Sequence, residues 1–169
     1  LGFSAEAVDA FLTAREGATA YSRTHLAAVS RSSLEVAAFS SLYAAPHLPF
    51  SVDLAPLPVL QKKRVPRSTP FHPSRAPHIA TIDAHAVVGE LTLRHILPAD
   101  RFTPYGMRSG SKLVSDYLTD RHRSRIDKLR ALAVCDEVGI LWLVGETIAH
   151  RAAVTPATGE ILTLTLTPA

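Results

Sequence analysis

The stretch Asp100–Leu129, DRFTPYGMRSGSKLVSDYLTDRHRSRIDKL, constrains the fold of the surrounding chain most strongly. It opens with a loop punctuated by Pro104, Gly106 and Gly110, passes through a short apolar pattern, and ends in a run of arginines. Glycine and proline at these spacings favour a turn, and the short apolar pattern leaves room only for small helices. We therefore expect a turn and short helices here, with regular strands on either side.

Two short helices are expected, over 110–120 (GSKLVSDYLTD) and 123–132 (RSRIDKLRAL). In the second, Ser124 and Asp127 have the spacing of a capping pair. Strand-like patterns flank the helices, at 78–84, 87–97, 131–136, 139–145, 150–155 and 160–166. Strands, two helices and then strands predict an α+β fold, a small mixed or antiparallel β-domain with two short helices.

The N-terminal part has a different texture. Residues 1–44 predict a helix capped by Ser4 and ended by Gly17, followed by a β-hairpin that turns at SRSS, residues 30–33. Eight of the twelve prolines fall within 45–78, which predicts an extended linker with at most edge pairing. The expected organisation is thus a helix-hairpin segment over 1–44, a Pro-rich basic linker over 45–78, and an α+β domain over 79–169.

Composition indicates a globular protein, with 47% hydrophobic and 20% charged residues among 169. The net charge of +3 is unevenly distributed, because Arg101–Arg130 holds eight Lys or Arg against three Asp. Such a basic segment is compatible with binding a polyanion and with a solvated basic face. The linker sequence QKKRVPR leaves the same two interpretations open, phosphate contact or a solvated tether.

Motifs for catalysis and metal binding are missing from the sequence. Neither GxxxxGK(S/T) nor GxGxxG occurs, and GMRSGSK, residues 106–112, has the wrong glycine spacing for a phosphate loop. The eight histidines never form HxH, HxxxH or HExxH, and no GxSxG surrounds a serine. The single Cys135 rules out an internal disulfide and reads as a buried, inert thiol or as a reactive one. We therefore expect no catalytic residue, no metal site and no cofactor bound by this chain.

The sequence also bears on location. No apolar run approaches the roughly 20 residues that span a bilayer, so we expect no membrane partner. Leu1 is not an initiator Met, and the first residues lack the features of a signal peptide. We expect a part of a longer cytoplasmic protein.

Taken together, LTLRHILPADRFTPYGMRSGSKLVSDYLTDR (91–121), ILWLVG (140–145) and VTPATGEIL (154–162) resemble the C-terminal, substrate-recognition domain of bacterial tRNA(Ile)-lysidine synthetases. The resemblance covers about residues 79–164. The family pattern is matched at Arg94, Asp100–Phe102, Pro104, Gly106, Lys112, Ser115–Tyr117, Trp142 and Gly145.

The resemblance implies an ATP- and magnesium-dependent ligase that attaches lysine to the wobble cytidine of an isoleucine tRNA. The chemistry would belong to an N-terminal domain with an SGGxDS loop, which this sequence lacks. The present chain would hold the tRNA acceptor stem and contact its own N-terminal catalytic domain. RNA helices are gripped mainly through phosphates and 2′-hydroxyls, which calls for Arg and Lys. The candidate RNA-binding residues are Arg94, Arg101, Arg108, Lys112, Arg121, Arg123, Arg125, Lys128 and Arg130.

Several alternatives stay open at this point. The domain could serve structure or protein interaction, docking on the catalytic domain or forming a homodimer without touching RNA. Asp100 and Arg101 read equally as a loop-fixing ion pair and as an RNA contact. Arg121, Arg125 and Lys128, at helical spacings of four and three, are expected on one exposed face. The glycine loop would lead into a helix whose N-terminal amides meet a phosphate, and Trp142 reads as a core residue or a stacking platform.

Overall fold

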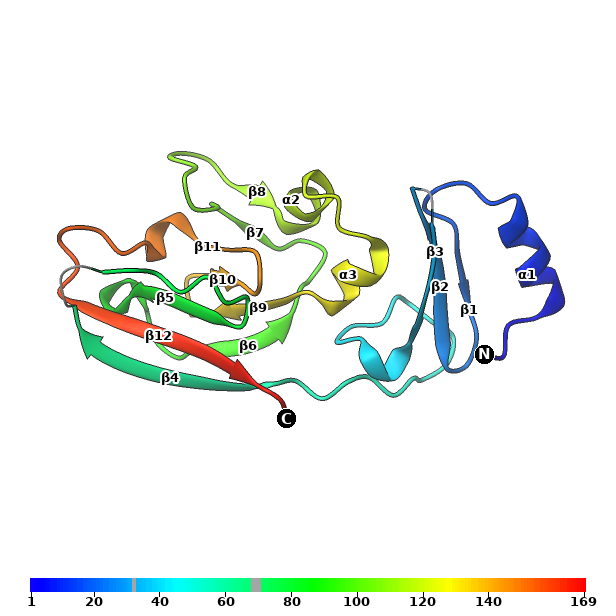
Figure 1. Ribbon diagram of the computed structural model, residues 1–169, viewed down its shortest axis with the longest axis horizontal. Helices are drawn as coiled ribbons and strands as arrows, with labels where there is room; N and C mark the ends of the chain where they lie inside the picture. Colours follow the sequence, from blue (N-terminus) through cyan, green and yellow to red (C-terminus); the bar gives the residue numbers. More distant parts are fainter. Residues whose placement is uncertain (32, 68–70) are drawn as a thin grey trace. The chain divides into compact units, whose positions relative to one another are not determined.

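The computed structural model describes residues 1–31, 33–67 and 71–169, and these fall into two compact units (Figure 1). We call Leu1–Pro56 with Leu118–Arg130 the N-terminal unit, and Leu57–Tyr117 with Ala131–Ala169 the C-terminal unit. The division into a helix-hairpin segment over 1–44, a linker over 45–78 and a domain over 79–169 stays a prediction. Among the described helices, none has the length and apolar character needed to cross a membrane.

The N-terminal unit begins with helix α1 (Ala5–Leu12) and a three-stranded antiparallel sheet. Its strands, in the order β1-β2-β3, are β1 (Thr19–Tyr21), β2 (His25–Ser30) and β3 (Ser33–Ala38). The predicted cap is confirmed, because the Ser4 hydroxyl accepts a hydrogen bond from the Ala7 amide at 3.2 Å. The helix ends at Leu12, before Gly17. The hairpin between β2 and β3 is confirmed, although Ser32 in its turn lies outside the described residues.

Helix α3 (Arg125–Arg130) completes the core of this unit. Its cap is the predicted one: the Ser124 hydroxyl accepts from the Asp127 amide, and the Asp127 carboxylate accepts from the Ser124 amide, both at 3.1 Å. This reciprocal pair satisfies two amides that the first turn of a helix leaves free. The apolar core holds Leu26, Ala28, Ala37, Phe39 and Leu42, the last two from or beside the 3₁₀ turn η1 (Phe39–Ser41), together with Ile126 of α3.

The C-terminal unit contains three antiparallel sheets, which confirms the α+β prediction. The four-stranded sheet has the order β11 (Thr147–Ile148), β10 (Ile140–Leu143), β9 (Leu132–Cys135) and β6 (Thr92–His95). The three-stranded sheet has the order β4 (Val59–Pro66), β12 (Glu160–Thr167) and β5 (Ile79–Asp83). A two-stranded hairpin joins β7 (Arg101–Phe102) to β8 (Lys112–Leu113), and helix α2 (Val114–Asp120) follows directly, ending in the N-terminal unit.

One core joins the two larger sheets. Strand β12 alternates leucine and threonine along LTLTLT, so its leucines are buried while its threonines remain half-exposed. Those leucines pack with Val134, Leu141 and Trp142 of the four-stranded sheet. Trp142 is only 3% exposed, which confirms it as a core residue, and Cys135 is a buried free thiol on β9. Burial raises the pKa of the Cys135 thiol, and this disfavours the reactive thiolate.

Strand β4 lies inside the predicted linker and forms the edge of the three-stranded sheet. The backbone is therefore extended with edge pairing, as the prolines suggested, but it is paired along its whole length with β12. Three cations, Lys62, Lys63 and Arg64, stand on this edge strand. Charged side chains on an edge discourage pairing with another chain.

Two strand predictions were wrong. Residues 150–155 form no strand, because His150–Ala152 is a 3₁₀ turn, η3, whose Arg151 is tied to Asp136. The strand expected over 87–97 is limited to Thr92–His95. The chain turns at Gly89, where φ is +71°. The Val88 amide donates to the Asp136 carboxylate, and the Val88 carbonyl accepts from the Glu137 amide. Short 3₁₀ turn η2 (Ala84–Ala86) precedes this segment.

Candidate nucleic-acid interface

The predicted basic residues divide into two kinds, and Arg94 represents the first. Its guanidinium donates two hydrogen bonds to the Asp100 carboxylate, at 2.7 and 2.8 Å, and a third to the His95 carbonyl at 2.9 Å. Burial opposes ionisation of Asp100, but hydrogen bonds from Arg94 and from the Leu97 amide outweigh it, so the pKa of Asp100 lies below its usual value. Arg94 thus holds the 95–100 turn in place, and the loop-fixing partner of Asp100 is Arg94 rather than Arg101.

Arg101 organises the base of the β7–β8 hairpin. Its Nε donates to the Ser111 hydroxyl and its terminal nitrogen to the Ser111 carbonyl, both at 3.0 Å. The Thr103 hydroxyl donates to the Gly110 carbonyl at 2.6 Å, which closes the loop above that bridge. Arg101 remains exposed while making these contacts, and Lys112 on β8 is half-buried. These contacts close the base of the hairpin loop.

Arg108 lies at the outer end of this hairpin and is exposed. Within the part of the chain that the structure describes, it forms no ion pair or hydrogen bond. Gly106 and Gly110 flank the tip with φ of +88° and +79°, a conformation that glycine adopts without strain. The two glycines form the turn that the sequence predicted, and Arg108 lies on it as an exposed cation.

The tip does not lead directly into a helix, contrary to expectation. Strand β8 intervenes, and the amide of Val114, the first residue of α2, donates to the Asp100 carbonyl at 2.9 Å. An amide already bonded to a carbonyl is not offered to a phosphate. The Val114 amide is therefore not available to a phosphate, and phosphate binding by this helix N-terminus stays a prediction.

The second group of cations lies in the N-terminal unit, around the turn between α2 and α3. Arg121 and Arg123 are exposed in this turn, and Arg125 is exposed as the first residue of α3. Because His122 interrupts the helix with φ of +60°, Arg121 is not on the same helix as Arg125, and the predicted helical spacing is wrong there. A hydrogen bond between Arg31 and the His122 ring helps to hold His122 in this turn.

The last two candidates have partners of their own. The Lys128 ammonium donates to the Thr119 hydroxyl at 2.7 Å and is half-buried. Arg130 is exposed but donates to the Ser41 carbonyl and hydroxyl at 3.3 and 3.1 Å. These contacts stabilise the end of α3 against residue 41 of the same unit. Arg121, Arg123 and Arg125 are thus exposed, and Arg121 and Arg123, like Lys128 and Arg130, also take part in interactions within the chain.

A further pair, unnoticed in the sequence, is Arg151 with Asp136. Arg151 donates to both carboxylate oxygens, at 3.1 and 2.6 Å, and also to the carbonyls of Ala86 and Gly139. The carboxylate also accepts from the amides of Val88, Val138 and Gly139, and its side chain is 0% exposed. Burial works against ionisation, yet these donors prevail and lower the pKa of Asp136. No local spacing could have signalled this pair, because the partners come from different loops.

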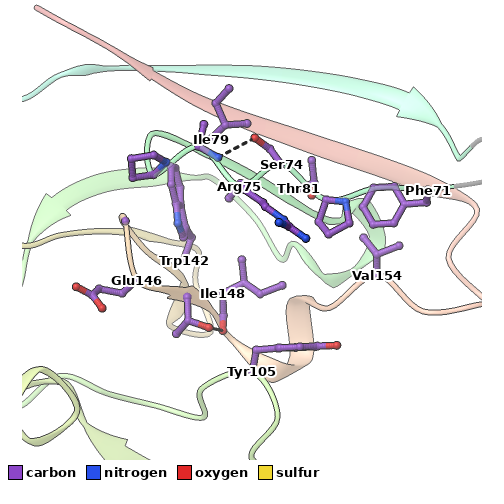
Figure 2. A pocket seen from close by; sticks show the side chains of 16 residues that line it. Phe71, Ser74, Arg75, Ile79, Thr81, Tyr105, Trp142, Glu146, Ile148 and Val154 are labelled. Atoms are coloured by element: carbon purple, nitrogen blue, oxygen red, sulfur yellow. Dashed lines mark hydrogen bonds between the residues drawn. The ribbon is translucent and has the colours of Figure 1, made fainter. Parts of the chain in front are cut away.

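A groove of about 470 Å³ opens in the C-terminal unit beside β5 and β11 (Figure 2). Trp142 and Ile148 line it from the four-stranded sheet, and Tyr105 enters from the hairpin. The Tyr105 amide donates to the Ile148 carbonyl at 3.0 Å, which fixes the backbone there. The residue as a whole is 62% exposed. Phe71 and Arg75 of the preceding loop complete the wall. Sequence analysis missed this groove, since its residues lie far apart in the chain.

The VTPATGEIL motif, residues 154–162, is held by hydrogen bonds within the fold. The Thr158 hydroxyl donates to the Asp83 carboxylate at 2.6 Å, and this hydrogen bond lowers the pKa of Asp83. The Thr155 amide donates back to Thr158, and Arg67 donates to the Thr155 carbonyl at 2.7 Å. The motif therefore locks the turn before β12. Across the described residues, no three His, Cys, Asp or Glu side chains gather as a metal site.

Comparison with known proteins gives relatives in sequence and in fold. The chain is 38% identical over 84 residues to the tRNA(Ile)-lysidine synthase of Parabacteroides distasonis, which covers 50% of this chain and 19% of that protein. It is 34% identical over 111 residues to the tRNA(Ile)-lysidine synthase of Bacteroides thetaiotaomicron, covering 65% of this chain and 26% of that protein. The matched regions are thus about a fifth to a quarter of the length of these relatives. No family model matches the chain.

A solved structure supports the fold. The crystal structure of a TILS C-terminal domain superposes with a TM-score of 0.52 at 19% identity, over 64% of this chain and 82% of that one. At such identity the likeness speaks for the fold, an α+β arrangement of mostly antiparallel strands. The resemblance seen in the sequence is confirmed: this chain is related in part of its length to the tRNA(Ile)-lysidine synthases and has the fold of a TILS C-terminal domain.

Proposed function

We propose that this chain is the tRNA-binding C-terminal part of a tRNA(Ile)-lysidine synthase and that it holds the acceptor stem of the substrate tRNA. The observation that carries the proposal is the exposure of Arg108, Arg121, Arg123 and Arg125 on two loops, in a chain similar to two such enzymes. Exposed cations suit phosphate contacts, which make up a large share of the contacts to an RNA helix.

The nine predicted residues do not contribute equally to this proposal. Arg108 and Arg125 are the primary candidates, because they are exposed and form no hydrogen bond or ion pair within the described residues. Arg101, Lys112, Arg121, Arg123, Lys128 and Arg130 are secondary, since the fold already engages or partly covers them. Arg94 is proposed to act only by holding the turn that carries the hairpin, because Asp100 occupies its guanidinium.

The chemistry of lysidine formation is proposed to lie outside this chain. ATP with magnesium does not fit the residues present: GMRSGSK forms a hairpin rather than a strand–loop–helix, and the described carboxylates form no metal cluster. We propose that this region supplies substrate binding to a cytoplasmic enzyme whose N-terminal domain performs adenylation and lysine transfer. Lysine-dependent release of AMP by the purified chain alone would contradict this division of labour.

The test of RNA binding is a salt series. The purified chain is titrated with an isoleucine tRNA transcript at several salt concentrations, and the logarithm of the affinity is plotted against the logarithm of the salt concentration. Phosphate contacts give a steep negative slope, about one unit for each cation neutralised. A substitution of Arg121, Arg123 and Arg125 together by Ala should weaken binding and flatten that slope by roughly two to three units. A triple variant with unaltered affinity and unaltered melting temperature would refute the proposed role.

A second function, docking on the rest of the enzyme or on another copy of the chain, is favoured by a different observation. Leu34 and Val36 are exposed on β3, at the edge of the N-terminal sheet, and Val8 of α1 is exposed as well. Apolar side chains on an edge strand are a common protein contact. Sedimentation of the purified chain checks self-association: Leu34→Lys should abolish a dimer if this face forms one, while tRNA binding should be unchanged.

A further inference from the structure

We propose that the groove beside Trp142 binds one unpaired nucleotide of the tRNA, and that the single-stranded 3′ end of the acceptor arm supplies it. This inference rests on the proposed function, because an acceptor stem bound by the chain brings its unpaired 3′ nucleotides with it. The groove itself is not part of the basic loops described above. It would add recognition of a base to a surface otherwise made for phosphates.

The walls of the groove have the chemistry that an unstacked base seeks. Tyr105, an exposed residue, and Phe71 line it from two segments, while Trp142 borders it from the core with 3% exposure (Figure 2). Single-stranded RNA is recognised by stacking its bases on aromatic rings and on arginine planes. The volume of about 470 Å³ falls in the range of pockets that hold small organic ligands.

Tyr105 is exposed because the backbone holds it there. The hydrogen bond from its amide to the Ile148 carbonyl, at 3.0 Å, and the bridge between Pro104 and Ala149 attach this end of the hairpin to the sheet. The ring also lies near the His150 ring, with centroids 6.3 Å apart. The fixed backbone places the exposed Tyr105 at the groove before a base arrives, which favours binding.

Charge around the groove is complementary to a nucleotide. Arg75 lines the groove, is exposed, and within the described chain makes no ion pair or hydrogen bond. In Figure 2 its guanidinium lies among the lining side chains, whereas the carboxylate of Glu146 points away from them. Arg108, on the same hairpin as Tyr105, adds a second exposed cation. A phosphate near Arg75 would therefore meet no facing carboxylate among the labelled residues.

Polar side chains of the groove are also available to hydrogen-bond the edge of a base. The Thr81 and Thr147 side chains and the Ser74 hydroxyl line the groove, although Ser74 accepts from the Ala76 amide and Thr147 donates to the Ile148 carbonyl. Hydroxyls can donate and accept, so they suit any base edge without selecting one. The groove is thus built for stacking with modest sequence preference, as expected for a site that takes a common 3′ tail.

The experiment is a cycle that combines a protein variant with an RNA variant. Binding of an isoleucine tRNA transcript is compared with binding of the same transcript lacking its unpaired 3′ nucleotides, for the wild-type chain and for Tyr105→Leu. We expect the wild-type chain to bind the truncated tRNA roughly fivefold more weakly or worse, from loss of one stacked base. Tyr105→Leu should show the same loss with intact tRNA and no further loss on truncation, because both changes remove one interaction.

Matched variants separate stacking from charge and from folding. Tyr105→Phe keeps the ring and should bind as the wild type does, whereas Tyr105→Leu should lower affinity without altering the salt slope. Arg75→Ala should lower affinity and flatten the slope by about one unit. Arg15→Ala removes an exposed cation far along the chain from the groove and serves as the charge control. Each variant is checked by its melting temperature.

The outcomes distinguish the two proposals. Steep salt dependence, with no effect of Tyr105→Leu or of truncation, would overturn the groove proposal and leave the tRNA-binding proposal standing. An effect of Tyr105→Leu that persists equally with truncated tRNA would show that the groove takes an internal flipped-out base, which overturns the assignment to the 3′ end. A chain that binds no tRNA at low salt would overturn both proposals.

Discussion

Two arginines of the C-terminal unit, Arg94 and Arg108, have opposite surroundings. Arg94 is half-buried and bidentate on Asp100, at 2.7 and 2.8 Å, while Arg108 is exposed at the hairpin tip. Arg151 repeats the first situation with Asp136, and Arg125 repeats the second. We call the first kind anchored and the second kind exposed.

The difference teaches what a basic segment is made of. A buried carboxylate destabilises the fold when the arginine that pairs with it is removed. An anchored arginine is therefore needed for stability. An exposed arginine contributes almost nothing to stability and is available to a phosphate. The net charge of a segment does not distinguish anchored from exposed arginines. The following predictions test this division in order of decreasing effect on the free energy of unfolding.

The largest effect is expected for Arg151→Ala. The variant leaves the Asp136 carboxylate, 0% exposed in the protein, without its charged donor. Breaking a buried ion pair at one partner costs about 3–5 kcal/mol. Urea denaturation should give a free energy of unfolding for the variant that is lower than that of the wild type by this amount. A loss below about 1 kcal/mol would mean that the amides of Val88, Val138 and Gly139 suffice for this carboxylate, and Arg151 would not be an anchor.

The next effect is the loss of stability in acid. Asp100 and Asp136 both have a pKa below the usual value in the folded chain, since hydrogen bonds from arginines and amides outweigh the effect of burial. A depressed folded pKa stabilises the protein above the unfolded value, near pH 4, and this contribution disappears as the pH falls through the folded pKa. The free energy of unfolding should therefore decrease from about pH 5 downward. Asp136→Asn should be less stable at pH 7 and should show a shallower acid dependence; an equally steep one would exclude Asp136 as a source.

An intermediate effect is expected for Ser124→Ala, which removes one half of the capping pair of α3. Loss of an N-cap hydroxyl costs about 1 kcal/mol, and the Asp127 amide loses its acceptor. Ser40→Ala, an exposed serine of the same unit, is the matched control and should change stability by less than about 0.5 kcal/mol. Equal effects for both variants would show that the cap contributes no stability of its own.

Much of the fold could be predicted because its signals are local. The Ser4 and Ser124 caps, the two short helices and the alternation of β12 are each written within a few consecutive residues. The strand expected at 150–155 could not be corrected from sequence, since the turn there depends on Arg151 reaching Asp136 in another loop. Local sequence patterns therefore predict most helices and strands, whereas contacts between distant residues determine where those predictions fail.

The candidate site was less predictable for the same reason. Composition found the basic segment, but only the structure shows that Asp100 occupies Arg94 while Arg108 stays exposed. Helical spacing also placed Arg121 with Arg125, and the positive φ of His122 separates them. The groove needs Tyr105, Arg75 and Trp142 from three distant segments, which no motif joins.

The smallest effect on stability, and the sharpest on binding, is expected for Arg108→Ala. An exposed side chain that forms no ion pair within the described chain should change the free energy of unfolding by less than about 0.5 kcal/mol. If the tip contacts a phosphate, the same change should flatten the salt dependence of tRNA affinity by about one unit. Arg15→Ala, which removes an equal charge elsewhere, should leave that slope within error of the wild type. Equal slopes for Arg108→Ala and Arg15→Ala would mean that only net charge affects binding. The hairpin tip would then make no specific phosphate contact. A destabilisation by Arg108→Ala approaching that of Arg151→Ala would break the comparison from the other side, because the exposed arginine would then also be an anchor.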